Sequence, residues 1–113
     1  MYPTSIRRRR ALATPKPQPP VISNDTPNSS LTNSDVTVVG KNFGRFKGPG
    51  DIYLGLNSTY SACGSLTAKA AFNWSDTSAT FHHGASAGLR YIYVVTKDGR
   101  YNEQGYAITF IAG

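Results

Sequence analysis

The sequence predicts an all-β fold, an antiparallel β-sandwich with an extended N-terminal arm. Three observations indicate this fold: a β-branched run at 36–39 that ends in a glycine-marked turn, apolar residues in alternation at 51–56, and two apolar strands near the C-terminus. The 113 residues allow one domain, and residues 21–113 approach the ~100 residues of a two-sheet sandwich. We therefore assign 1–20 to the arm and 21–113 to the sandwich.

The arm combines proline with basic residues. It carries five of the seven prolines, and because proline fixes φ near about −65° and has no N–H, we expect an extended arm. It holds no acid and five basic residues, Arg7, Arg8, Arg9, Arg10 and Lys16. Residues 21–113 hold seven basic and six acidic residues, a net charge of +1. An acidic partner should therefore contact the arm. The alternative interpretation is that the arm is only a solubilising tail.

The strands follow from apolar alternation between turn residues. We expect the first strand at a sheet edge because prolines precede it, and loops at 24–34, 41–50 and 57–65. A helix over 67–72 is the alternative to one strand, but no capping pattern supports it. The expected strands are 20–23, 35–40, 51–56, 66–74, 78–82, 89–96 and 106–111.

The last two strands carry the clearest pairing signal. Between them, Asp98-Gly99 is typical of a tight type I′ hairpin turn. Tyr91 and Tyr93 alternate with Ile92 along the first of these strands, and the second strand is also apolar on both faces. Coverage of one of these faces by a partner is therefore an open alternative.

The stretch Val36–Gly44 is the most strongly patterned segment. Gly40 and Gly44 bracket a polar turn around Phe43, which we expect to fold back into the core. The stretch resembles the V-x-V-x-G-x-N-F-G pattern of IPT/TIG immunoglobulin-like domains, and 73–79 resembles their W-S-x-T-x-I segment, with Ala79 in place of a larger aliphatic residue. The resemblance covers about residues 20–113 and implies an Ig-like sandwich, with Trp74 buried between the sheets, but no single function.

The core follows from the inward-facing positions of these strands. Alternation predicts one apolar residue in two on each half-buried strand, and the turn after the early strand adds an aromatic plug. The predicted core residues are Val36, Val38, Phe43, Trp74, Ile92, Val94, Ile108 and Phe110.

No pattern in the sequence predicts a catalytic, cofactor or metal site, so we expect a protein that is not an enzyme. His82 and His83 are adjacent on a strand and should point to opposite faces, and Cys63 has no charged neighbour to activate it. One cysteine allows no internal disulfide, which favours folding in a reducing cytosol. No apolar run suits a signal peptide or a membrane span, so we expect no membrane partner.

These features predict a non-enzymatic structural or binding module. By analogy, a lone Ig-like domain with an anchoring arm is similar to accessory proteins of bacteriophage particles, such as capsid decoration (cement) proteins or other head or tail components. The expected partners are capsid or tail subunits, with nucleic acid or an acidic surface possible through the arm and no small-molecule substrate. The expected location is the virion, assembled in the host cytoplasm.

Two alternatives remain open. One is a nucleic-acid-binding IPT/TIG-type domain, against which the loops offer few basic residues, Lys41, Arg45, Lys47, Lys97 and Arg100. The other is an extracellular carbohydrate- or protein-binding module that uses a tyrosine surface. Its candidate residues are Tyr53, Tyr60, Tyr91, Tyr93 and Tyr101.

Overall fold

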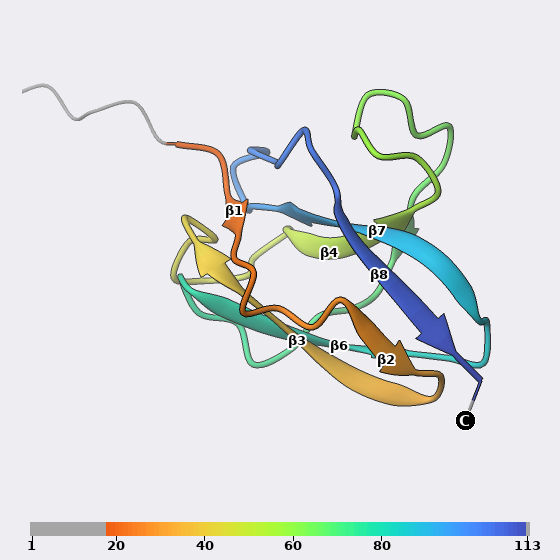
Figure 1. Ribbon diagram of the computed structural model, residues 1–113. Helices are drawn as coiled ribbons and strands as arrows, with labels where there is room; N and C mark the ends of the chain where they lie inside the picture. The colour runs from red at the N-terminus through yellow and green to blue at the C-terminus, as the bar shows by residue number, and fades with distance from the viewer. Residues whose placement is uncertain (1–17, 113) are drawn as a thin grey trace, which may run out of the picture.

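The computed structural model describes residues 18–112, which form two β-sheets and no helix (Figure 1). The smaller sheet has the order β1-β3-β6 and the larger has the order β2-β8-β7-β4-β5. All pairs are antiparallel except β2 with β8. The bounds are β1 Val21–Ile22, β2 Ser29–Leu31, β3 Ser34–Lys41, β4 Asp51–Gly55, β5 Thr67–Ala68, β6 Ser78–His83, β7 Gly88–Val95 and β8 Tyr106–Ile111.

The core lies between the two sheets, as in a β-sandwich. On β3, Val36 and Val38 face inward and pair in register with Phe81 and Ala79 of β6. The larger sheet supplies the opposing layer, and burial of each large aliphatic or aromatic side chain contributes roughly 1.5–3 kcal/mol. Seven of the eight predicted core residues are buried: Val36, Val38, Phe43, Ile92, Val94, Ile108 and Phe110.

Trp74 is the exception, because it is half-buried and packs against the rim of the core instead of lying between the sheets. Its Nε1 donates a hydrogen bond to the carbonyl oxygen of Gly44 at 2.9 Å, and its ring lies 6.2 Å from that of Phe43. An indole N–H requires an acceptor when it leaves water, and here the acceptor is on the loop at the end of the sandwich. The ring therefore stays at the rim.

The prediction of a strand over 66–74 is wrong for most of that segment. Only Thr67–Ala68 pairs, with β4, and Phe72 then forms an isolated bridge to Thr80 of β6. Between these two points Ala70 has φ 52°, which no regular strand allows. The Asp51 carboxylate accepts hydrogen bonds from the N–H groups of Ala70 and Ala71 at 3.1 and 2.8 Å. This segment therefore crosses from the larger sheet to the smaller one, with Asp51 satisfying its backbone.

The expected loop 24–34 contains a short strand, β2, that alternation did not indicate. Ser29, Ser30 and Leu31 pair in parallel with Thr109, Phe110 and Ile111 of β8. The sequence Ser-Ser-Leu has no period-2 apolar pattern, and the strand forms because the edge of β8 offers unpaired backbone groups.

The connection from β7 to β8 is longer than a two-residue hairpin, so the type I′ prediction is wrong. A type I′ turn needs positive φ at two positions, but only Gly99 has it, at 88°. Gly99 N donates to the carbonyl oxygen of Thr96 at 3.0 Å, and the chain then continues to Asn102. The Asn102 side chain makes the hydrogen bonds to β7 that a neighbouring strand would otherwise make. Its Oδ1 accepts from Val94 N at 2.7 Å, and its Nδ2 donates to the Ile92 carbonyl oxygen at 3.1 Å.

The chain itself covers part of the outer face of the larger sheet. Tyr93 points to this face, yet it is fully buried, and its hydroxyl donates to the carbonyl oxygen of Asn57 at 2.5 Å. Burial is the main cause that raises the pKa of Tyr93, which keeps the hydroxyl a donor. The connection 57–65 thus supplies at this position the cover that a partner could have supplied, whereas Leu89 and Ile111 on the same face stay exposed. Within 18–112 no helix is long and apolar enough to span a membrane.

Candidate functional site

The candidate site is the end of the sandwich where the arm joins it. We call this region the arm end and define it as residues 18–22, the end of β3 with the β3–β4 loop, 40–50, and the β7–β8 turn 96–100. The five predicted arm residues Arg7, Arg8, Arg9, Arg10 and Lys16 lie outside the residues that the structure describes.

At this end of the sandwich, β1 pairs with the end of β3. Val21 pairs with Lys41 and Ile22 with Gly40, and Pro20 just before them is buried. Glycine is required at position 40 because an added Cβ would lie 1.9 Å from the Val21 carbonyl oxygen. The glycine that ends the β-branched run thus lets β1 approach the sheet edge closely.

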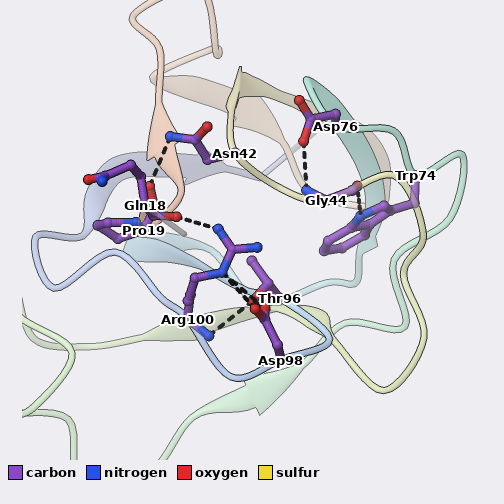
Figure 2. A network of polar contacts seen from close by, with 9 residues as sticks. All are labelled: Gln18, Pro19, Asn42, Gly44, Trp74, Asp76, Thr96, Asp98 and Arg100. Carbon is purple, nitrogen blue, oxygen red and sulfur yellow. Dashed lines mark hydrogen bonds and ion pairs between the residues drawn. The ribbon is translucent and has the colours of Figure 1, made fainter. Parts of the chain in front are cut away.

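Side chains from both sheets hold the residues just before β1 (Figure 2). Asn42, which follows β3 and has φ 66°, donates from Nδ2 to the Pro19 carbonyl oxygen at 3.3 Å. Arg100, from the turn of the larger sheet, donates to the Gln18 carbonyl oxygen. Residues 18–20 were assigned to the arm from sequence, but they contact the sandwich.

Arg100 is itself held in place by the turn that carries it. Its Nε lies 3.0 Å from both carboxylate oxygens of Asp98, and its backbone N donates to Thr96 Oγ1 at 3.0 Å. The hydrogen bond from Thr96, followed by the bond from Arg100, lowers the pKa of the exposed Asp98 carboxyl below its ordinary value. The turn therefore presents Arg100 to the arm in one orientation, which is visible in Figure 2.

The arm end also gathers most of the basic residues of the sandwich. Gly48 in the β3–β4 loop lies against the Lys97 side chain of the β7–β8 turn, which brings the two loops together. Phe46 is exposed, with a relative residue accessibility of 65%, and Arg45 Cζ and Lys97 Nζ each lie 5.7 Å from its ring centroid. Of the seven basic residues in the sandwich, five belong to the strand end and loops here: Lys41, Arg45, Lys47, Lys97 and Arg100.

Sequence reasoning missed Asn42 and Arg100 as contacts of the arm, and it missed Phe46. Asn42 and Arg100 lie 23 and 82 residues away from their partners, a separation that no local pattern predicts. A signal for Phe46 was available, because Arg45-Phe46-Lys47 places a large apolar residue between two cations in a glycine-marked loop.

The other candidate residues do not converge on chemistry. His82 is exposed and lies 2.8 Å from Asp35, while His83 is buried on the opposite face, as alternation predicts. Tyr60 and Tyr101 stack on each other with centroids 3.9 Å apart. Within 18–112 no three His, Cys, Asp or Glu side chains come together in a way that could hold a metal ion.

The two segments that carry the IPT/TIG resemblance lie in contact. Gly44 N donates to Asp76 Oδ1 at 2.9 Å, and Phe43 N donates to the Asp76 carbonyl oxygen at 3.0 Å. Together with the Trp74 bond to Gly44, these contacts join the β3–β4 loop to the segment before β6 (Figure 2). In comparisons with known proteins, no family model, no curated protein and no solved structure matches the chain.

Proposed function

We propose that the chain is a non-enzymatic, Ig-like structural module of a bacteriophage virion, a capsid decoration protein or another accessory head or tail component, attached to neighbouring subunits through its basic arm. One observation carries the proposal: the root of the arm is held by Asn42 from one sheet and Arg100 from the other. The surrounding loops have the same charge sign as the arm. An arm with a fixed root costs less entropy to dock than one joined by a free linker.

The charge of the arm and of the arm end indicates the class of partner. Residues 1–20 contribute five positive charges and no negative one, and the basic side chains of the arm end have the same charge sign. A partner that fits both is an acidic groove on a protein subunit, into which arginine side chains reach as paired donors to carboxylates. On a shell of repeated subunits, many weak attachments of this kind add up through avidity.

The test is the occupancy of the protein on purified particles. Deletion of residues 1–17 keeps the contacts of Gln18 and Pro19, so the melting temperature should stay close to that of the full chain while occupancy falls. Quantitative mass spectrometry of the particles measures occupancy, and calorimetry of the free protein measures melting. Full occupancy of the truncated chain would contradict attachment through the arm.

A second candidate function, nucleic-acid binding, is favoured by Phe46. Its exposed ring lies between Arg45 and Lys97, and an aromatic ring flanked by cations is a platform on which a base can stack while the cations contact phosphates. The arm would then lie along the backbone of the same strand and contribute a salt-dependent share of the affinity.

A filter-binding titration with single-stranded and duplex oligonucleotides tests this candidate. Phe46→Ala should weaken single-strand binding by about 1–3 kcal/mol, the range for one stacked base, and leave duplex binding nearly unchanged. Phe46→Tyr, which keeps an aromatic face, is the matched control and should retain affinity. Equal affinities of the natural chain and Phe46→Ala for the single strand would exclude the stacking role.

A further inference from the structure

A second basic region lies away from the arm end, in a pocket of about 370 Å³. Its walls come from the end of β4, the segment around β5, the end of β6 with the residues that follow it, and the start of β7. The pocket and the arm end lie at opposite ends of β3. His83 in the pocket wall pairs with Ser34 at the beginning of β3, whereas β1 at the arm end pairs with the end of β3. We call it the basic pocket, and its polar lining is Ser65, Thr67, Lys69, His83, Ser86 and Arg90.

Hydrogen bonds set the tautomer and orientation of the neutral His83 ring. Its Nε2 lies 2.6 Å from the carbonyl oxygen of Ser86, which only accepts, so the ring proton is on Nε2. Nδ1 is then an acceptor, and Lys69 Nζ lies 3.4 Å from it. The ring stacks on Phe110 at 3.7 Å, and burial lowers the pKa of His83 in spite of the bond to Ser86. The neutral imidazole therefore positions the Lys69 ammonium at the pocket.

Arg90 is also oriented toward this region. One terminal nitrogen donates to the Leu89 carbonyl oxygen at 2.9 Å and the other donates to Ser86 Oγ at 2.7 Å. These bonds use two of the five N–H groups of the guanidinium, so donors remain for a ligand. The Ser86 hydroxyl accepts from Arg90 and can turn its own hydrogen toward the pocket.

Among the described residues, neither Lys69 nor Arg90 forms an ion pair with a carboxylate. Within 18–112 the ion pairs are His82 with Asp35 and Arg100 with Asp98, and the Asp51 carboxylate is occupied by backbone N–H groups. Burial, and then the charge of Arg90, lower the pKa of Lys69. Two like charges at one cavity cost free energy that a bound anion would offset. The arm cannot be that anion, because residues 1–20 contain no acid.

We propose that the basic pocket binds a small organic oxyanion, with its phosphate or carboxylate head group between Lys69 and Arg90 and its apolar body against Leu54 and Leu56. Two observations favour an organic molecule over a bare ion. The volume lies within the ~300–1,000 Å³ that small-molecule sites occupy, and the two leucines line the same cavity. The proposal does not depend on attachment through the arm.

The experiment is a titration of the full-length protein followed by ¹H–¹⁵N NMR, with phenyl phosphate, benzoate, inorganic phosphate and benzyl alcohol as probes. Phenyl phosphate or benzoate should shift the amides of residues 65–69 and 83–90, inorganic phosphate should do so more weakly, and the uncharged alcohol should not. The tighter of the two aromatic anions identifies the head group as phosphate or carboxylate.

Variants separate the pocket from general charge effects. Lys69→Gln and Arg90→Gln each remove one charge-assisted hydrogen bond and should weaken binding by about tenfold or more. Lys41→Gln removes the same charge at the arm end and should leave the titration unchanged. The spectrum of each variant reports directly whether it is folded. The proposal is wrong if no anion shifts the pocket amides, or if the folded variants bind the anions as tightly as the natural chain.

Discussion

The arm end and the basic pocket are two basic regions that the net charge of +1 on residues 21–113 conceals. At the arm end, cations lie on loops around an exposed aromatic ring, and residues 1–20 carry charge of the same sign. In the basic pocket, Lys69 and Arg90 line a cavity beside a neutral imidazole, and Lys69 is partly desolvated. The first arrangement suits an extended acidic surface, and the second suits a single small anion. The placement of charge therefore says more about partners than its sum does.

The two regions should also differ in their response to salt. Exposed charges are screened over a Debye length of about 8 Å at physiological ionic strength, whereas enclosed charges are screened less. Attachment through the arm end should weaken steeply as salt rises, and occupancy of the basic pocket should weaken less. The predictions below use this contrast, beginning with the largest expected effect.

The largest effect should come from the aromatic plug beneath the arm end. Phe43 is fully buried, and Phe43→Ala should lower the free energy of unfolding by about 3–5 kcal/mol through lost packing and a cavity. Phe46→Ala is the matched control on the same loop, because its ring is exposed, and it should change stability by no more than about 0.5 kcal/mol. Urea denaturation measures both, and equal losses would show that the loop is packed differently.

An intermediate effect is expected when a natural glycine in each region is replaced by alanine. Gly40→Ala would put a Cβ 1.9 Å from the Val21 carbonyl oxygen, so β1 should separate from β3 at a cost of about 1–3 kcal/mol. In Gly84→Ala, next to the basic pocket, the new Cβ meets nothing within 4 Å, so stability should hold. Hydrogen exchange should show faster exchange in the first variant alone for Ser23, whose N–H donates to the Val39 carbonyl oxygen at 2.7 Å. Retained protection there would argue against the β1–β3 pairing.

The smallest effect should be a pH dependence that belongs to the basic pocket. Because burial lowers the pKa of His83 in the folded state, the unfolded chain binds more protons once the pH falls below about 6.5. Stability should therefore decrease as the pH falls from about 7 to about 5.5, before carboxylates titrate. In His83→Gln this part of the slope should disappear. A natural chain that gains stability over the same interval would reverse the sign and contradict the buried, neutral imidazole.

Much of the fold follows from local patterns in the sequence. The run Val36–Val39 has inward valines at alternate positions, and the predicted placement of Phe43 is confirmed. The same alternation places His82 outside and His83 inside. Patterns of this kind succeed where one face of a strand is buried, because the pleat then leaves one register.

The rest depends on contacts between distant segments. The strand expected over 66–74 ends early because Asp51, far away in the sequence, binds the N–H groups of Ala70 and Ala71. Trp74 stays at the rim because the carbonyl oxygen of Gly44 accepts its indole N–H. The basic pocket combines residues from β7, the end of β6 and the segment after β5, and no spacing of residues in the sequence predicts that they meet.

The central claim is that the basic arm, and not the basic pocket, attaches the protein through charge. The most direct measurement is occupancy on particles across a salt series for the natural chain, for Arg7–Arg10 all replaced by glutamine or all by lysine, and for Lys69→Gln with Arg90→Gln. The glutamine variant should lose most of its occupancy and its salt dependence, while the lysine variant and the pocket variant should stay close to the natural chain. If the glutamine variant attaches as well as the natural chain at every salt concentration, or if the pocket variant loses as much, the claim is wrong.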